Sequence, residues 1–392
     1  MVAGLVGLLY AGLLAWLWDH FHGDPLGFVH QGTVWLYPQR QGTNGYDGQF
    51  YFYIAQHPFH AVAFLDLPSI RLQRIFFPLL IDLVALGQRP LMPYAMLLIN
   101  WLAVVCGTWL VARLLRRWGR SPWFALSYAL AAGIPVALQF DTPEPLAFAL
   151  VALGVTCWER GSSPAGEPPP DEALPDRRAP LRVSLLIVGT LAFAAALLTR
   201  EHTIYFVAAY AAAALLRRDW RQLGAAVATL VPVTIWGAYL SATLGKSSLS
   251  QIPVLEYIPF VTYWVQGNLV DPTPRSAGYA AQYIVPAAVF GVLAIGTLAG
   301  IAVRGVRTRR WAAPAPLLLA LLGNVHLLTF LPLQGYQHQV AASRYALGLA
   351  LAAVLWAGST RPRWLLWLTP LCAAGLLAYL YGLLTQDPAY LW

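Results

Sequence analysis

Residues 45–58 read Gly-Tyr-Asp-Gly-Gln-Phe-Tyr-Phe-Tyr-Ile-Ala-Gln-His-Pro, and the rest of the chain is organised around this stretch. A single acid, Asp47, lies between Gly45 and Gly48, and an aromatic run with roughly helical spacing follows it and ends at a proline. We expect a loop that brings a carboxylate to a membrane surface, followed by a short helix that lies along that surface. Aromatic side chains are common at membrane interfaces, so interfacial anchoring explains the aromatic run. It does not explain Asp47.

The composition outside this stretch is that of a membrane protein. Of the 392 residues, 58% are hydrophobic and 11% are charged, and several apolar runs reach the roughly 20 residues needed to cross hydrocarbon. The sequence therefore predicts an all-α integral membrane protein and excludes an ordinary soluble domain. The net charge of +8 does not indicate a nucleic-acid partner, because the arginines cluster in short loops between apolar runs. The three cysteines lie in or at the ends of apolar runs, so neither a disulfide framework nor a CxxC metal site is predicted.

The arginine-rich loops predict the membrane topology. An apolar run at 2–18 lacks the basic segment of a signal peptide, and we expect it to be a retained span. The other expected spans lie at about 91–112, 122–139, 145–158, 183–198, 203–216, 222–242, 281–303, 312–332, 344–358 and 364–384. Between them, arginine-rich loops alternate with arginine-poor loops, and the arginine-rich loops should be cytoplasmic.

The short apolar run at 75–88 decides how many spans precede the first arginine-rich loop. Pro78 and Asp82 interrupt it, and its roughly 14 residues fall short of the usual 17 to 25. If it crossed the membrane, either the long loop before it or every basic loop would lie on the wrong side. We therefore predict a surface or re-entrant helix here. The predicted topology has about eleven transmembrane helices, a cytoplasmic N-terminus and a long first external loop at 19–90 that contains membrane-parallel helices.

A polar segment divides the chain into two membrane modules. Residues 159–182 are rich in proline, glycine and charge, so we expect a flexible cytoplasmic linker there. It separates an N-terminal module at 1–158 from a C-terminal module at 183–392. No internal repeat is recognisable across the linker, which argues against a transporter built from inverted repeats.

The predicted topology places acids, histidines and isolated cations from distant segments on the external face. They are Asp47, Asp141, Glu144, Arg200, Glu201, His202, Lys246, Glu256, Asp271, Arg275, His338 and Arg344. Each has a simpler explanation when taken alone: Asp141 and Glu144 could cap the next helix, Arg200 and Glu201 could form a surface ion pair, and Arg344 could be an interfacial charge. Together they favour a functional site, because charges near hydrocarbon are costly and usually serve a path or a site.

Five short motifs resemble the GT-C superfamily of polytopic glycosyltransferases. They are YDGQFYFYIA at 46–55, RLQRIFFPLL at 71–80, DTPEPLAFALV at 141–151, LLTRE at 197–201 and SRYALGLAL at 343–351. The first is similar to the WDGxWYxxIA motif of bacterial cell-surface glycopolymer proteins related to the GPI mannosyltransferases. Tyr46 stands where that motif has Trp, and Gln49 and Phe50 occupy the next positions. The resemblance covers about residues 1–240 and only thinly the remainder.

The resemblance implies an extracytoplasmic active site in the plasma (inner) membrane. Its expected reaction is inverting transfer of a sugar from a polyprenyl-phosphate donor to a glycan, lipid or protein acceptor. Such a reaction needs a base for the acceptor hydroxyl, for which we expect Asp47, and cations for the departing phosphate. Guanidinium groups match phosphate oxygens, so Arg200 and Arg344 are the main candidates. Weaker candidates for the phosphate are His202, His338, Lys246 and Arg275.

The remaining polar residues are assigned to the substrate. Asp141 and Glu144 could bind sugar hydroxyls or orient a cation, and the other expected substrate contacts are Tyr46, Gln49, Arg74 and Glu201. No second aspartate closely flanks Asp47, so we expect metal-independent catalysis without a cofactor. Asp141 and Glu144 leave a divalent metal open as an alternative.

Two other function classes remain open. A lipid-linked saccharide flippase or transport component could use the same external groups to recognise a head group without catalysis. It should carry intramembrane charges along a path to the cytoplasm, whereas the predicted spans are nearly free of charge and His326 is their main polar exception. We interpret His326 as a packing residue. A purely structural subunit would not need the external cluster.

Overall fold

The computed structural model describes residues 1–35, 42–58, 60–161, 179–245, 284–308, 315–330 and 339–385. All regular elements in these ranges are α-helices or short 3-10 helices. Most of the expected linker lies outside the described residues, as do five of the expected site residues: Lys246, Glu256, Asp271, Arg275 and His338.

Several of the helices are long and apolar enough to cross a membrane. In the described part of the chain, five helical segments meet this condition: α1 (Val2–His20), α6 with the turn before it (Arg89–Arg117), α12 with α13 (Trp220–Leu244), α16 (Val285–Thr308) and α20 (Leu365–Leu384). A sixth is added if Pro122–Ala129 and Gly133–Gln139, which are bent by 54° relative to each other, form one broken span. The protein is therefore a helical, multi-pass membrane protein.

Other helices fall in the remaining predicted spans. They are α9 (Glu144–Gly161), α10 (Ala179–Leu197), α11 (Ile204–Arg217), α17 (Pro316–Thr329) and α19 (Gln339–Thr360). Each corresponds to an apolar run in the sequence, but α11 and α17 have only 14 residues each. The total of eleven spans and their orientation therefore remain predictions.

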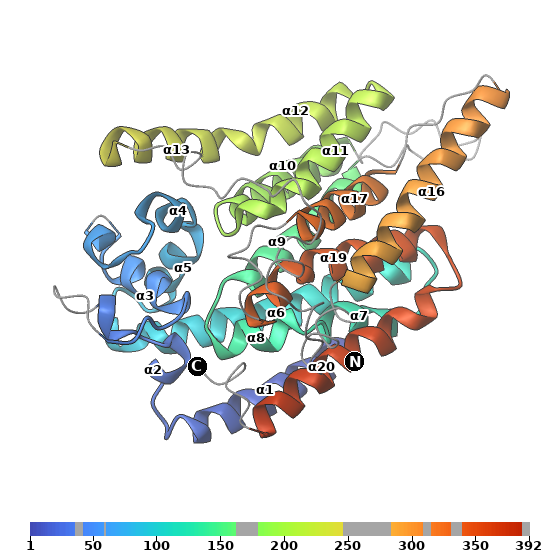
Figure 1. Ribbon diagram of the computed structural model, residues 1–392. Coiled ribbons are helices and arrows are strands. Elements are labelled where there is room, and N and C mark those ends of the chain that lie inside the picture. Colours follow the sequence, from blue (N-terminus) through green and yellow to red (C-terminus); the bar gives the residue numbers. More distant parts are fainter. Residues whose placement is uncertain are drawn as a thin grey trace.

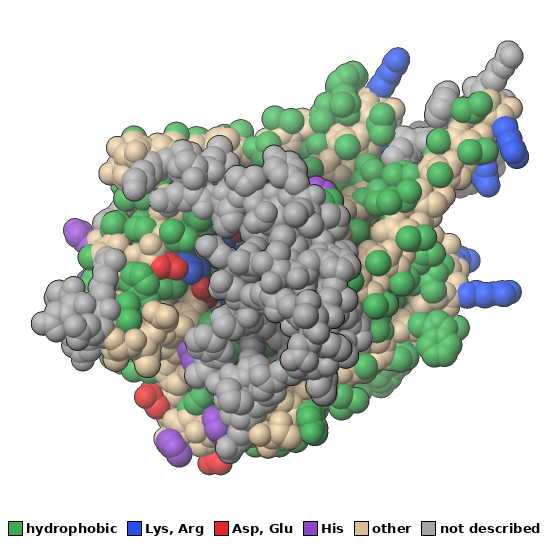
Figure 2. Space-filling view, in the orientation of Figure 1, with side chains coloured by type: hydrophobic (Ala, Val, Ile, Leu, Met, Phe, Trp, Pro, Cys, Tyr) green, Lys and Arg blue, Asp and Glu red, His purple; other side chains and the backbone are tan. Residues whose placement is uncertain are grey.

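The helices pack around a shared apolar core. Helix α9 lies against both α6 and α10, and α11 lies against α17, which also contacts α19. Large buried side chains such as Phe148, Trp158 and Phe193 fill the space between them. In Figure 1, α12 and α13 run along one edge of the helix assembly, while α1 and α20 run along the opposite edge. Apolar side chains also cover much of the outer surface (Figure 2), as a lipid environment permits.

The first loop folds into a group of short helices beside this assembly (Figure 1). They are α2 (Leu26–Val29), α3 (Gly48–Gln56), α4 (Pro68–Gln73) and α5 (Phe76–Val84), with 3-10 turns between them. The aromatic run of α3 is buried, with Phe50, Tyr51, Phe52 and Tyr53 at most 6% exposed. These side chains therefore form the core of the loop region, where we had expected interfacial anchors.

The apolar run at 75–88 contains the short helix α5. This helix packs against α3 and α6 through Phe77 and Ile81 and leaves Leu79 and Leu83 exposed. Its 9 residues are too few to cross hydrocarbon. A helix of this kind can lie at a membrane surface, and that placement remains a prediction.

Candidate functional site

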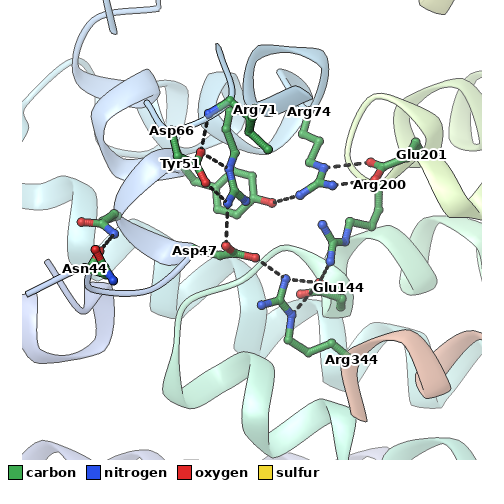
Figure 3. Close-up of polar contacts among 12 residues, drawn as sticks. Asn44, Asp47, Tyr51, Asp66, Arg71, Arg74, Glu144, Arg200, Glu201 and Arg344 are labelled. Carbon is green, nitrogen blue, oxygen red and sulfur yellow. Dashed lines mark hydrogen bonds and ion pairs between the residues drawn. The ribbon is translucent and has the colours of Figure 1, made fainter. Parts of the chain in front are cut away.

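Asp47 stands at the start of α3 but does not cap it. Its side chain makes no capping hydrogen bond. Instead, Oδ1 lies 2.9 Å from Nη2 of Arg71 and Oδ2 lies 2.8 Å from Nη2 of Arg344 (Figure 3). The carboxylate keeps 24% of its surface exposed. Asp47 thus joins the first loop to α19, 297 residues later in the chain.

Close backbone packing fixes the position of Asp47. A methyl group on Gly48 would collide with the carbonyl oxygen of Phe140, so the α3 loop and the turn before α9 can meet only through a glycine. Tyr46 packs on the ring of Phe140 with centroids 4.5 Å apart. These contacts explain why small and aromatic residues flank the acid.

Gln49, which the sequence assigned to substrate, holds the loop backbone. Its side chain is fully buried, its Oε1 accepts a 2.8 Å hydrogen bond from Gly32 N, and its Nε2 donates at 2.8 Å to Asn44 O. Both ends of the amide are therefore used inside the protein. Contact of Gln49 with substrate stays a prediction.

Glu144 is the centre of the buried part of the site. It is the first residue of α9, and its Oε1 lies 2.7 Å from Nη2 of Arg200 and 2.8 Å from both Nε and Nη2 of Arg344. All three side chains are buried, with relative exposures of 0 to 3%. Buried ions need such partners because removal from water costs each several kcal/mol. The simpler roles of surface ion pair and interfacial charge do not describe these buried residues, whereas Glu144, in the first turn of α9, can also stabilise that end of the helix.

Arg200 has hydrogen-bonding capacity that its described neighbours do not use. Its Nε and Nη1 are buried and have no partner among the described residues, and the same holds for Oε2 of Glu144. The guanidinium also lies 5.4 Å from the centroid of the Tyr345 ring. Unsatisfied buried donors are costly, so this edge of Arg200 is suited to an anion or an ordered water.

Arg71 and Arg74 approach the site from α4, one helical turn apart. Arg71 pairs with Asp66 through two 2.8 Å hydrogen bonds and lies 4.3 Å from the centroid of the Phe50 ring. Arg74 forms a fork with Glu201, with distances of 2.8 and 2.5 Å. It also donates to Tyr51 Oη at 3.2 Å.

Sequence reasoning selected Arg74 and missed Arg71 and Asp66. The signal was the spacing in Arg71-Leu-Gln-Arg74, because residues three apart share one face of a helix. The simpler alternative, an ion pair between the neighbours Arg200 and Glu201, does not occur. Arg200 pairs with Glu144, and Glu201 pairs with Arg74.

The charges of the site balance. The guanidiniums of Arg71, Arg74, Arg200 and Arg344 face the carboxylates of Asp47, Asp66, Glu144 and Glu201. Burial alone raises the pKa of Asp47, but the nearby guanidiniums, chiefly Arg71 and Arg344, outweigh burial and hold the pKa well below its usual range. Asp47 is therefore ionised and, while both pairs persist, weakly basic.

Asp141 lies in the same turn as Glu144 but outside the ion-pair network. It is fully buried, and the described residues provide a single weak hydrogen bond, from Nδ2 of Asn100 to Oδ1 at 3.4 Å. Burial raises the pKa of Asp141 well above its usual range. Its φ of +46° is in the left-handed region, which non-glycine residues adopt rarely and mostly at constrained sites.

His202 is buried beside Arg200, between the rings of Phe148 and Tyr345 at centroid distances of 5.6 and 5.4 Å. Burial and the neighbouring Arg200 lower its pKa to about 3, so the imidazole is neutral at pH 7. Neither ring nitrogen has a partner among the described residues. His202 can therefore donate one N–H to an anion but adds no positive charge.

The described part of the chain contains no group of three or more His, Cys, Asp or Glu side chains arranged to hold a metal ion.

Figure 2 shows acidic and basic side chains close together beside the first-loop helices, while other Lys and Arg side chains project from the far end of the molecule. The site and the arginine-rich end thus lie apart.

What the described residues offer is an ionised, partly exposed carboxylate next to buried guanidiniums, of which that of Arg200 has two nitrogen donors without a described partner. Comparison of the chain with family models, with curated proteins and with solved structures found no match.

Proposed function

We propose that this protein is a membrane glycosyltransferase that uses a polyprenyl-phosphate sugar as donor. The observation that carries the proposal is the direct contact of Asp47 with Arg344, which shares Glu144 with the incompletely paired Arg200. Acceptor activation requires a general base, which a carboxylate can provide, and fixed cations stabilise the departing phosphate. Both groups are present in one site of a membrane protein.

In the proposed reaction, an acceptor hydroxyl attacks the anomeric carbon of the donor sugar. Asp47 takes the hydroxyl proton as the new C–O bond forms. The bond between the anomeric carbon and the phosphate oxygen breaks, and its electron pair leaves with the phosphate. The products are the glycosylated acceptor and a polyprenyl phosphate. Attack opposite the leaving group inverts the anomeric centre, and no metal or cofactor enters the balance.

The free edge of Arg200 is the proposed position for the phosphate. Its Nε and Nη1 are buried donors without a described partner, and hydrogen bonds between guanidinium and phosphate are among the stronger ones in proteins. Arg344 connects this position to Asp47, since it contacts Asp47 and shares Glu144 with Arg200. A donor phosphate at Arg200 would attract Arg344 as well, so we expect the Asp47–Arg344 pair to open when the donor binds.

Opening of that pair would also adjust the base. The paired Asp47 has a pKa well below the usual range because of Arg71 and Arg344, which together outweigh the effect of burial. A general base works best when its pKa is near the working pH. Transfer of Arg344 from Asp47 to the donor phosphate raises the pKa of Asp47 at the moment when the donor is bound. Asp47 would thus reach its working basicity only when the donor is bound.

The function is tested with purified protein, a membrane extract as the source of acceptor, and a panel of undecaprenyl phosphates that carry mannose, glucose or galactose, scored for release of undecaprenyl phosphate. The proposal expects release with at least one donor and an inverted product. Asp47→Asn should abolish most of this release. Its matched control is Asp24→Asn, because Asp24 is an aspartate of the same loop whose Oδ1 accepts a hydrogen bond from Leu26 N. Binding of these lipids without any release would favour the flippase or transport alternative and overturn the enzyme proposal.

A further inference from the structure

Helix α13 (Leu230–Leu244) is the second part of a span with many exposed apolar side chains, and it packs against the loop region that carries two site arginines. Much of the α12–α13 span is exposed, with Val231 and Ile235 at 51% and 66%. Three side chains at helical spacing turn the other way: Trp236, Leu240 and Leu244 pack against the core of the first loop. In Figure 1, α13 passes beside α4, with which it is in contact.

Among the described residues, one side-chain hydrogen bond joins α13 to α4 and adds to this packing. Nε1 of Trp236 donates a 2.8 Å hydrogen bond to the carbonyl oxygen of Leu72, in the last turn of α4. In a continuous helix this carbonyl would accept from the amide of Phe76, but Phe76 N donates to Leu198 O instead. The last carbonyls of a helix need partners from outside it. The indole of Trp236 therefore completes the end of α4.

The fixed carbonyl lies between the two site arginines of α4. Arg71 precedes Leu72 and pairs with Asp47, while Arg74 ends the helix and pairs with Glu201. A rotation or shift of this short helix would move both guanidiniums away from their carboxylates. Helix α4 has only 6 residues, so its own hydrogen bonds do not hold it rigidly.

We propose that Trp236 is a positioning residue, which holds α4 so that Arg71 and Arg74 stay aligned with Asp47 and Glu201. The role rests on the proposed function, since its effect on turnover acts through Asp47. Misplacement of reacting groups by about 1 Å can reduce rates roughly a hundredfold. Trp236 touches neither carboxylate and acts only through the backbone of α4.

The test compares Trp236→Phe with Trp101→Phe. Both variants keep an aromatic ring and lose one indole hydrogen bond to a backbone carbonyl, because Trp101 Nε1 donates to Gly7 O at 3.0 Å, between α6 and α1. We expect Trp236→Phe to lower release of undecaprenyl phosphate from the best donor of the panel about tenfold or more. Its affinity for undecaprenyl phosphate itself should not change, because Arg200 and Arg344 are untouched. Trp101→Phe should change neither quantity.

A second measurement does not depend on catalysis. Hydrogen exchange followed by mass spectrometry should show faster exchange over residues 68–76 in Trp236→Phe than in wild type, with no such change in Trp101→Phe. Trp236→Tyr, which retains an aromatic donor, should restore part of the protection and turnover. This variant also serves if Trp236→Phe does not fold.

The two measurements separate the two proposals. If wild type releases no lipid phosphate, the proposed function fails, and the exchange rates over 68–76 alone decide the role of Trp236. Unchanged exchange in Trp236→Phe, or equal losses of turnover in Trp236→Phe and Trp101→Phe, would overturn the positioning role of Trp236.

Discussion

Glu144 and Asp141 are two carboxylates in one turn, three residues apart, and both are fully buried. Their surroundings are opposite. Glu144 receives Arg200 and Arg344 at 2.7 to 2.8 Å. Asp141 has no described cation and receives only a weak amide contact from Asn100, at 3.4 Å.

The comparison shows that burial does not by itself decide what a carboxylate does. Burial disfavours the charged form of any acid, and a cation within a few ångström reverses that preference. Asp141 consequently has a raised pKa, whereas Asp47, which is paired with two arginines, has a lowered one. We infer that the paired acids form the site and that Asp141 supports the turn behind it.

The sharpest test of this division is Asp47→Asn. Asparagine keeps the size and much of the hydrogen bonding but removes the basic oxygen, so turnover should fall about a hundred- to ten-thousand-fold. Donor affinity should not fall, because the proposed phosphate ligands Arg200 and Arg344 are unchanged and Arg344 no longer pairs with a charged Asp47. The measurement is release of undecaprenyl phosphate beside binding of the donor. Near-normal turnover would contradict the role of base and return Asp47 to a structural role.

Glu144→Gln should have the largest effect on stability. It leaves the buried guanidiniums of Arg200 and Arg344 without their shared counter-charge, and loss of one partner of a buried pair typically costs about 3–5 kcal/mol. Chemical unfolding in detergent micelles measures the difference. The matched control is Asp141→Asn, which should cost less than about 1 kcal/mol near neutral pH, because Asp141 has no described cation to leave unpaired. Equal losses in the two variants would remove the distinction between the acids.

Arg200→Lys and Arg344→Lys test geometry at constant charge. Lysine cannot reproduce the fork of a guanidinium, so each variant should lose a charged hydrogen bond to the phosphate. Such bonds contribute about 1.5–3 kcal/mol, or roughly tenfold or more in affinity. Binding of undecaprenyl phosphate measures the change. Arg361→Lys is a suitable control, because its exposed guanidinium bonds the Trp118 carbonyl and no other described residue. Unchanged affinity in both site variants would contradict the phosphate assignment.

The last expected effect is a pH dependence of the free energy of unfolding. Burial raises the pKa of Asp141, so above the unfolded value of about 4 the folded state holds a proton that the unfolded state releases. This contribution makes the protein less stable as pH rises, by at most about 1.4 kcal/mol per pH unit. Asp141→Asn removes it, so the stability of the variant relative to wild type should increase with pH.

Asp47 should show the opposite sign in the same experiment. Its pKa is lowered because Arg71 and Arg344 outweigh burial. Its contribution is present above the unfolded value of about 4 and is lost as pH falls below it. Parallel pH profiles for Asp47→Asn and Asp141→Asn, each compared with wild type, would show that the two acids do not differ in protonation.

The sequence was sufficient for the parts of the fold that depend on hydrophobic runs. Apolar stretches of about 20 residues predict membrane helices because unpaired backbone groups are intolerable in hydrocarbon, and a helix lies in each predicted run. It also singled out Asp47, Glu144, Arg200 and Arg344, because charges are rare in such a chain. It did not predict that the α3 aromatic residues are buried, because the same residue types, Tyr and Phe, occur both at membrane interfaces and in protein cores.

The sequence by itself therefore determined the class of the protein and which residues carry charge near the membrane. Only the tertiary structure decided how those charges pair. Arg344 meets Asp47 across 297 residues of chain, and Arg74 meets Glu201 across 127. The hydropathy of a segment can be read from that segment alone, whereas an ion pair depends on how two segments pack against each other. That packing separates Glu144 from Asp141, although the sequence places them three residues apart.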